Sequence, residues 1–474
     1  MSNTKHYIWS AFNRFGVQVI GFVGNVLIAR QLTPDDYGLV AMLAIFMGIS
    51  WNFTEAGFAD CLIRKYDADR KDYATIFIHN IGFSLVLYLI LYFTAPLISS
   101  FFQRTELIDI TRILGLSIVI KAITLTEFTR IRKELKFSRI ASIQLISSLI
   151  SVVIAYLMAL NGFGYWAIVG QTLSIAIVNL ILIIILNKWV PYFYFSWSRY
   201  KEMRGFSNNL LISYFTNQLG QNMYSVFIGK FQPTPILGYF NQASKINDVS
   251  FQSINSVVLA TSYPILAKET DRRLRKKMYK NILNHFLFIQ FTVSFYIIGT
   301  SHSLIVFLFG EQWEATAPIL QLLVVSFILI PLTSLNSNII KIENKSKLYR
   351  NLTILRNLLI FSSLLITFRF SIEIILYGLI GARFISVLTD VFLCGKYIDF
   401  MPREQFGIAL KQIWAPLLSC FLAVYITDLF NMTIPWKYLM VFTPIYFLFF
   451  IIINLITKNK SFFMFLNKIK LLRR

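Results

Sequence analysis

The feature that most constrains this chain is a succession of apolar stretches, each about 20 residues long, which continues from near residue 8 to residue 457. A helix of that length matches the hydrocarbon thickness of a bilayer. Charged residues make up only 14% of the 474 residues, and the mean hydropathy is +0.62. A soluble domain carries about 25% charged residues. The sequence therefore predicts an all-α integral membrane protein with about fourteen transmembrane helices.

The expected spans follow one another with short connections. They are 8–30, 38–60, 76–99, 113–129, 139–160, 163–187, 206–229, 244–265, 282–308, 316–340, 350–368, 373–395, 412–429 and 438–457. No connecting loop is long enough to form a separate domain, and 206–229 and 244–265 are the most polar of these spans. No A-x-A-like cleavage site follows the N-terminus, so we expect no removable signal peptide.

The basic residues are distributed unevenly between the two sides of these spans. With the N-terminus inside, about three quarters of the 45 Lys and Arg fall on inward segments and about a sixth on outward ones. The positive-inside rule then predicts that both termini are cytoplasmic. The net charge of +22 is thus a topology signal, and it requires no nucleic acid partner. We expect the densest basic run, 271–280 (DRRLRKKMYK), to lie against anionic lipid.

Residue types that hold metals or perform catalysis are sparse. The cysteines Cys61, Cys394 and Cys420 form no CxxC pair, and the whole chain has only four histidines. We therefore expect no cofactor, no metal site and no enzymatic activity.

A gapless offset of 200 residues relates two parts of the chain. The expected outward turn at 30–39 (RQLTPDDYGL) matches the turn at 230–239 (KFQPTPILGY), and Gln18 falls on Gln218. Six spans separate the copies, so both run in the same direction through the membrane. Parallel repeats of this kind are a transporter architecture. We predict two pseudo-symmetric lobes around a central cavity, at 1–200 and 201–400, followed by additional spans and a basic tail at 401–474.

Polar side chains recur at helical spacing on the four spans of this repeat. Because such groups are costly against lipid, they are expected to line a water-filled cavity or to form hydrogen bonds between helices. The predicted cavity residues are Arg14, Gln18, Asn25, Asn52, Gln218, Gln221, Asn222, Gln252 and Asn255.

Several ionisable residues also fall within or beside the expected spans. Glu55 and Asp248 are candidates for coupling to H⁺ or Na⁺, or for neutralising nearby cations. Lys121 and Arg383 lie mid-span away from the repeat, and Arg383 and Asp390 are two helical turns apart, so they are candidates for one charge network. Arg356 is expected near a cytoplasmic helix end, with its head group reaching toward water. Cations in a cavity favour an anionic substrate such as a phosphate or pyrophosphate.

A series of short motifs lies within residues 1–340, and their order and spacing are characteristic. They are LIARQLTPDDYGLVAM (27–42), EAGFADCLIRK (55–65), TIFIHN (75–80), RKELKFSRIASI (132–143), GFGYWAIVGQ (162–171), LGYFNQASKI (237–246), SYPILAKETD (262–271) and FGEQWEATAPILQLL (309–323). In this order and spacing the chain resembles the Wzx-type polysaccharide flippases of the multidrug/oligosaccharidyl-lipid/polysaccharide (MOP) exporter superfamily. It is similar in particular to the colanic acid and teichuronic acid exporters.

The resemblance implies a function and a setting. Its substrate would be an undecaprenyl-pyrophosphate-linked oligosaccharide, moved from the cytoplasmic to the outer leaflet of the bacterial inner membrane. Membrane lipids and other polysaccharide assembly proteins are the implied partners, and two lobes in one chain are compatible with a monomer. Arg14 resembles the first-span arginine that lipid II flippases use at their cavity.

Two other functions compete with this interpretation. A cavity dominated by acidic groups such as Glu55 and Asp248 would indicate a drug or cation antiporter of the same fold. A membrane polymerase, ligase or acyltransferase would need a large outward loop or an intramembrane catalytic histidine. Neither His79 nor His285 has a convincing motif around it.

The polar stripes generate a first prediction. Cysteines placed at Gln18, Gln218 and Gln252 are expected to react with a membrane-impermeant, water-soluble thiol reagent, because cavity-lining positions are hydrated. Mass-tag labelling of each variant measures this. Protection of all three would instead indicate dry helix packing.

Overall fold

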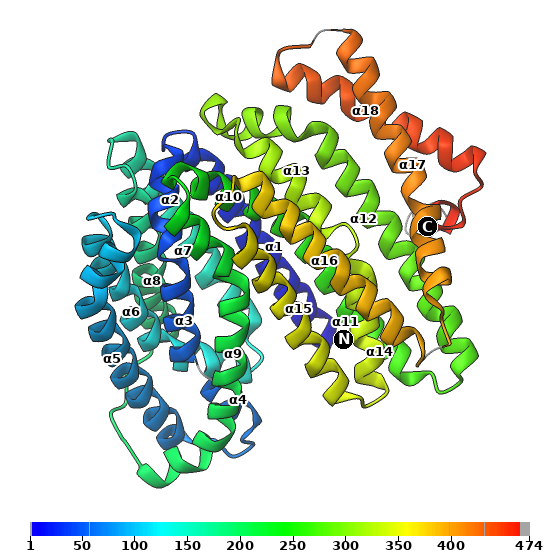
Figure 1. The fold of residues 1–474 in the computed structure, drawn as a ribbon. Helices are drawn as coiled ribbons and strands as arrows, with labels where there is room; N and C mark the ends of the chain where they lie inside the picture. The colour runs from blue at the N-terminus through cyan, green and yellow to red at the C-terminus, as the bar shows by residue number, and fades with distance from the viewer. Residues whose placement is uncertain (1, 56, 398, 431, 465–474) are drawn as a thin grey trace. The chain divides into compact units, whose positions relative to one another are not determined.

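A computed structural model describes the backbone of residues 2–55, 57–397, 399–430 and 432–464 (Figure 1). Side chains are described for all of these except 2–15, 55, 206–217, 219, 221 and 252–253. Every regular element in this part of the chain is helical. The predicted all-α class is therefore confirmed.

The chain divides into two compact units, Met1–Gly238 and Tyr239–Arg474. The first holds α1 (Ser2–Ala29), α2 (Pro34–Met42), α3 (Ala44–Glu55), α4 (Phe58–Arg64), α5 (Arg70–Phe102), α6 (Leu107–Lys133), α7 (Phe137–Leu160), α8 (Trp166–Asn187), α9 (Trp197–Phe231) and the start of α10 (Thr234–Asn247). The second continues with η1 (Asp248–Gln252), α11 (Ser253–Lys268), α12 (Arg272–Phe309), η2 (Glu311–Trp313), α13 (Thr316–Phe327), α14 (Ile330–Ile342), α15 (Ser346–Thr367), α16 (Ile372–Gly395), α17 (Pro402–Leu429) and α18 (Pro435–Ile456).

The division falls after Gly238, whereas the sequence repeat predicts a boundary near residue 200. The difference arises because α9, the first span of the second repeat, packs within the first unit. There the amide of Asn52 on α3 donates a hydrogen bond to the side-chain oxygen of Gln218 on α9, at 2.9 Å.

Eight helices of the described residues are long and apolar enough to cross a membrane, and nine if one bent pair counts as a span. They are Arg70–Phe102, Phe137–Leu160, Trp166–Asn187, Arg272–Phe309, Thr316–Ile342, Ile372–Gly395, Pro402–Leu429 and Pro435–Ile456. The chain is therefore a multi-pass membrane protein. The other expected spans correspond to helices that are broken or carry more polar residues, such as α9, and the total of fourteen stays a prediction.

The second span of each repeat copy is interrupted. In the first copy α2 ends at Met42 and α3 begins at Ala44. In the second copy the π-helical turn η1, which contains Asp248, separates α10 from α11. Interrupted spans at corresponding positions of two halves indicate binding sites in transporters, and π-helical turns are frequent at functional sites.

The two turns of the repeat, which the sequence predicts to face outward, contact each other reciprocally within the first unit. A Cβ atom built on Gly38 would lie 2.2 Å from the carbonyl oxygen of Thr234, and one built on Gly238 would lie 2.0 Å from that of Pro34. Each glycine thus faces the residue that lies four positions before the other. This reciprocity supports the 200-residue offset predicted from the sequence.

Arg104, in the loop between α5 and α6, ties the same region together. Its guanidinium donates two hydrogen bonds to the carboxylate of Asp35, at 2.8 and 3.1 Å, and one to the hydroxyl of Thr234 at 2.9 Å. It also pairs with Glu106 at 3.1 Å. The hydrogen bond to Asp35 raises the pKa of Arg104 above its ordinary value. A permanent cation therefore holds both turns of the repeat against the α5–α6 loop.

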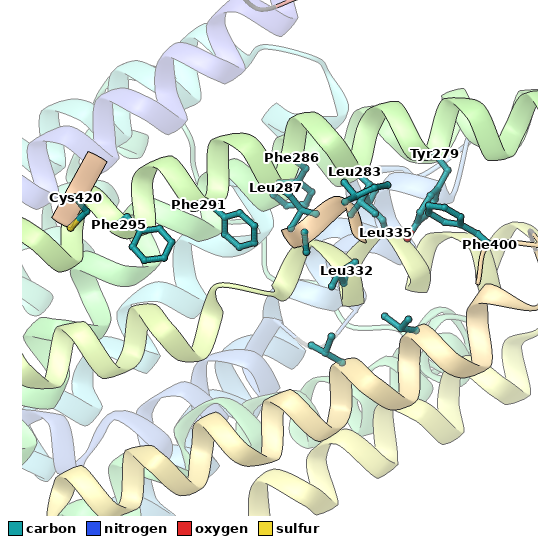
Figure 2. Packing of buried hydrophobic residues seen from close by; sticks show 14 of the residues in the cluster. Tyr279, Leu283, Phe286, Leu287, Phe291, Phe295, Leu332, Leu335, Phe400 and Cys420 are labelled. Carbon is teal, nitrogen blue, oxygen red and sulfur yellow. The ribbon is translucent and has the colours of Figure 1, made fainter. Parts of the chain in front are cut away.

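The second unit has one extended apolar core built along α12. Figure 2 shows side chains of α12, from Tyr279 to Phe295, packed with Leu332 and Leu335 of α14. The Tyr279 hydroxyl donates to the side-chain oxygen of Asn336 at 2.9 Å, and Asn336 donates to Gln405 at 3.0 Å. The buried polar groups of this core therefore hydrogen-bond to one another.

The basic run 271–280 differs in part from the expected lipid-facing anchor. Arg275 is buried and pairs with Glu343, and its guanidinium also donates to the carbonyl oxygen of Glu269. Lys276 pairs with Glu404 at 2.9 Å. These two cations are directed into the protein because helices pack around this end of α12. The exposed members, which remain available to lipid, are Arg272, Arg273, Lys277 and Lys280.

The glycine contact generates a second prediction. Gly38→Ala and Gly238→Ala should each lower the free energy of unfolding by roughly 1–3 kcal/mol, because the new methyl group would overlap a backbone carbonyl that cannot rotate away. Gly82→Ala is the control, since nothing lies within 4 Å of its added Cβ. Thermal unfolding of the purified variants measures the difference. Equal melting temperatures for Gly38→Ala and Gly82→Ala would contradict the contact.

Candidate functional site

The second unit contains a cavity of about 410 Å³ among six helices, α11 to α16. Its wall includes Asn255 of α11, Gln290 of α12, Arg356 of α15 and Arg383 of α16. The chain between α13 and α14 also lines it at Ile328 and Leu329, where the span Thr316–Ile342 is broken. Both arginines lie near the middle of their helices, in stretches that the sequence predicts to span the membrane, so we expect the cavity at membrane depth.

Arg356 forms an ion pair across two helices. Its Nη2 atom lies 2.9 Å from Oδ2 of Asp390 on α16, and the Asp390 side chain is only 3% exposed. A carboxylate this deeply buried needs a close cation, because desolvation otherwise costs several kcal/mol. The expectation that Arg356 lies near a helix end and extends toward water is therefore wrong.

Arg383 is held by different partners. Its Nη1 donates to the hydroxyl of Ser326 at 3.0 Å, and its guanidinium lies 3.7 Å from the centre of the Phe327 ring. Both partners stand at the end of α13, directly before the break. Asp390 forms its ion pair with Arg356 of α15. A network that joins Arg383 to Asp390 stays a prediction.

Two polar atoms of the cavity wall are buried without a hydrogen-bond partner among the described residues. They are the side-chain oxygen of Asn255 and Nε of Arg356. Buried polar groups normally find a partner, so an unmatched donor and acceptor in one cavity indicate a place where a ligand or water binds. The cavity thus offers two guanidinium groups, a hydrogen-bond donor and a hydrogen-bond acceptor.

The first unit has its own polar seam between α3, α6 and α9. Asn52 donates to Gln218, and Asn222 donates to the backbone oxygen of Gln218 at 3.1 Å. The ammonium group of Lys121 lies 3.6 Å from the centre of the Trp51 ring, one residue from Asn52. Lys121 therefore lies beside the repeat's polar stripe, although the sequence suggested a separate location.

The remaining predicted residues are distributed as follows. Gln18 is half-buried on α1, the side-chain oxygen of Asn25 accepts from the Tyr37 hydroxyl at 3.3 Å, and Asp248 is exposed in η1. Four side chains lie outside the described residues: Arg14, Glu55, Gln221 and Gln252. The roles assigned to all these residues stay predictions.

Arg356 is the residue that sequence reasoning missed. It stands in the apolar stretch 352–366, and an intramembrane carboxylate such as Asp390 requires a cationic partner. Those two facts limit the partner to a few intramembrane cations. Only the packing of α15 against α16 in the structure identifies Arg356, rather than Arg383, as the ion-pair partner of Asp390.

The comparison with known families decides the relationship. Residues 27–318, well over half of the chain, match the family model described as "Polysaccharide biosynthesis protein". The chain belongs to this polysaccharide biosynthesis protein family. The predicted relationship to polysaccharide exporters is thereby confirmed.

Curated relatives of this polysaccharide biosynthesis protein share about a quarter of its residues. The teichuronic acid biosynthesis protein TuaB of Bacillus subtilis is 25% identical over 367 residues, which cover 73% of this chain and 72% of TuaB. The succinoglycan biosynthesis transport protein ExoT of Rhizobium meliloti is 24% identical, over 68% and 66% of the two chains. The lipopolysaccharide biosynthesis protein WzxC of Escherichia coli is 22% identical, over 67% and 65%.

Solved structures show the fold of this family member. The lipid II flippase MurJ in an inward closed conformation matches with a TM-score of 0.71 and 14% identity, covering 94% of this chain and 99% of MurJ. An inward-facing multidrug resistance MATE family transporter of the MOP superfamily matches with a TM-score of 0.64 and 16% identity, covering 81% and 94%. The predicted MOP-type fold is confirmed.

The ion pair generates a third prediction. Arg356→Met should lower the free energy of unfolding by about 3 kcal/mol, because it leaves the Asp390 carboxylate buried without its cation. Arg356→Met combined with Asp390→Asn should recover much of that loss. Arg350→Met is the control, since Arg350 is exposed on the same helix. Thermal unfolding in detergent measures all three, and equal losses at 350 and 356 would contradict the pairing.

Proposed function

We propose that this protein transports an undecaprenyl-pyrophosphate-linked oligosaccharide from the cytoplasmic to the outer leaflet, for assembly of a surface polysaccharide. The observation that supports this most is the cavity at membrane depth lined by Arg356 and Arg383. Guanidinium groups bind phosphate oxygens with paired hydrogen bonds, so a pyrophosphate linkage is a suitable ligand. The names of the relatives TuaB, ExoT and WzxC agree with a role in polysaccharide assembly.

The transport cycle we propose is alternating access without a covalent step. The break between α13 and α14 lies directly beside Ser326 and Phe327, which hold Arg383. A movement at this break would therefore reposition the guanidinium. Pro331 at the start of α14 cannot donate a backbone hydrogen bond and thus favours such a break.

The setting and the driving force are part of the same proposal. The protein lies in the bacterial cytoplasmic membrane with both termini inside, as the basic residues predict. It needs no organic cofactor, and a gradient of H⁺ or Na⁺ supplies the driving force. Other polysaccharide assembly proteins deliver and consume the substrate, and a single chain suffices for transport.

A cationic drug fits this cavity less well than an anionic substrate. Among the described residues no carboxylate lines it, and the neighbouring Asp390 is already paired with Arg356. A cationic compound would have to displace a guanidinium at membrane depth, where unpaired charge is costly. The antiporter alternative is therefore less favoured than the flippase.

The fourth prediction tests transport. Deletion of the gene should abolish surface polymer and lead to accumulation of a complete undecaprenyl-linked repeat unit inside the cell. Arg383→Gln should reduce export at least roughly ten-fold at normal protein abundance, because it removes a charged contact to the phosphates. Arg14→Ala should also lower export, as the resemblance of Arg14 to the first-span arginine of lipid II flippases implies. Lipid-linked intermediates and surface polysaccharide are measured together.

Arg369→Gln is the matched control, because Arg369 is exposed and does not line the cavity. It should export normally. An unfinished glycan in the deletion strain would indicate an enzyme instead. Normal polysaccharide with altered drug sensitivity would indicate the antiporter.

A further inference from the structure

A second cavity, of about 690 Å³, lies wholly within the first unit. It is bounded by the first turns of α5, the last turns of α6 and the linker 188–196 between α8 and α9. The expected inward loops of this unit meet here, so the cavity is predicted to lie on the cytoplasmic side of the membrane. None of the transport residues discussed above lines it.

The linker is an extended segment held against α5 by specific contacts. The Phe77 ring packs edge-on against Trp189 and Phe193, with ring centres 5.5 and 5.8 Å apart. The backbone N–H of Ser196 donates to the hydroxyl of Thr75 at 3.3 Å. Val190 and Phe193 are more than 70% exposed, which is typical of a segment lying at the membrane–water interface. The cavity therefore opens at the level of lipid headgroups.

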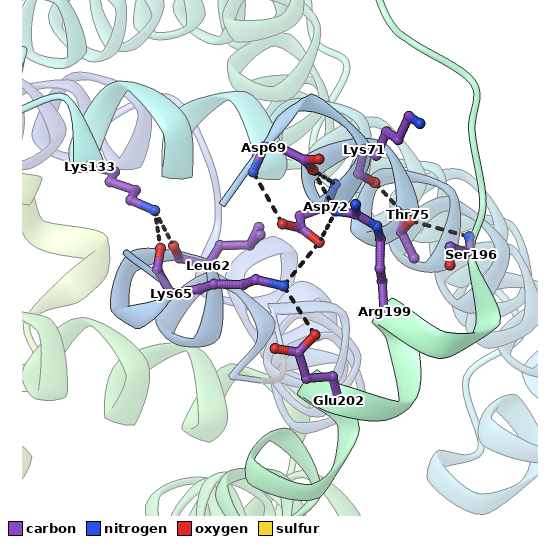
Figure 3. A network of polar contacts seen from close by, with 10 residues as sticks. All are labelled: Leu62, Lys65, Asp69, Lys71, Asp72, Thr75, Lys133, Ser196, Arg199 and Glu202. Atoms are coloured by element: carbon purple, nitrogen blue, oxygen red, sulfur yellow. Dashed lines mark hydrogen bonds and ion pairs between the residues drawn. The ribbon is translucent and has the colours of Figure 1, made fainter. Parts of the chain in front are cut away.

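The acidic residues of this cavity are already paired. Asp69 lies 2.6 Å from Arg199, Glu127 is buried against Arg130, and Glu134 pairs with Lys136 at 2.6 Å. Figure 3 shows the Asp69 and Arg199 part of this network, which continues to Asp72, Lys65 and Glu202. Their negative charge is thus neutralised within the protein.

Three cations of the cavity wall have no carboxylate partner among the described residues. The Arg70 guanidinium lies on the face of the Tyr192 ring, 4.5 Å from its centre. Lys133 donates to the backbone oxygens of Leu62 and Lys65 (Figure 3), and no ion pair of Lys188 is found. The hydroxyl of Thr126, which also lines the cavity, is buried without a hydrogen-bond partner. Positive charge and an unused hydroxyl remain available to a ligand.

We propose that this cavity binds the phosphate-bearing headgroup of an amphiphile in the cytoplasmic leaflet. Arg70 and Lys188 contact the phosphate, Thr126 donates to it, and the faces of Tyr73 and Trp189 cover the rest of the headgroup. Phosphate matches the unpaired cations, and basic pockets at the cytoplasmic side of membrane helices bind anionic headgroups. This site is separate from the transport cavity and does not rest on the proposed function.

The fifth prediction concerns lipid binding by the purified full-length chain. Native mass spectrometry with short-chain phosphatidylglycerol should show saturable binding, and phosphatidylcholine should bind at least about ten-fold more weakly because its headgroup has no net charge. Arg70→Gln should weaken phosphatidylglycerol binding about ten-fold, the loss of one charge-assisted contact. Lys71→Gln should change it less than about two-fold, because Lys71 lies over Tyr194 and outside the cavity.

Thr126→Val keeps the charge and nearly the volume of the side chain, so it tests the site even if Arg70→Gln fails to fold. It should weaken phosphatidylglycerol binding about three-fold. A second arm adds inorganic pyrophosphate. Displacement of the lipid by millimolar pyrophosphate would identify a site open to soluble phosphates, and retention of the lipid would identify a lipid-specific site; both support the proposal. Equal binding of the two lipids, or equal losses for Arg70→Gln and Lys71→Gln, would overturn it.

Discussion

The structure depends on one constraint: charge placed in a bilayer must find its partner inside the protein. Arg356 and Asp390 meet this constraint with an ion pair between the middle of α15 and the last third of α16. Arg383 meets it with Ser326 and the Phe327 ring. These contacts fix the relative rotation of α13, α15 and α16, because a helix turned the other way would expose a guanidinium to lipid. The same contacts create a cavity that can hold an anion.

The first unit meets the same constraint mainly with amides. Asn52 and Gln218 join α3 to α9, and Lys121 lies against Trp51. An amide pair costs less to bury than an ion and can be broken and remade more easily. The close contacts at Gly38 and Gly238 have the opposite character, because they join backbone to backbone and leave no space for movement. The rigid turns of the repeat therefore flank helices whose polar contacts can be broken and remade.

Much of the fold was predictable from sequence because its signals are local. Apolar length predicts spans, the placement of Lys and Arg predicts their direction, and the 200-residue offset predicts two similar turns. The number of spans was harder to predict, because polar stripes reduce the apolar character of helices such as α9. The unit boundary differed from the repeat boundary for a related reason: Gln218, a polar residue of α9, finds its partner on α3.

By itself the sequence determined the class of the protein and which side chains are too polar to face lipid, and it predicts the sidedness of the loops. These properties depend on the transfer of each segment from water to membrane, which each residue influences almost independently. Only the tertiary structure decided that Asp390 pairs with Arg356 and that the Arg383 guanidinium lies over the Phe327 ring. It also decided that Asp69, beside the 188–196 linker, is paired with Arg199, while Arg70 lies over the Tyr192 ring. Pairing depends on distances of a few ångströms between separate helices, and helical periodicity within one helix carries no information about its neighbours.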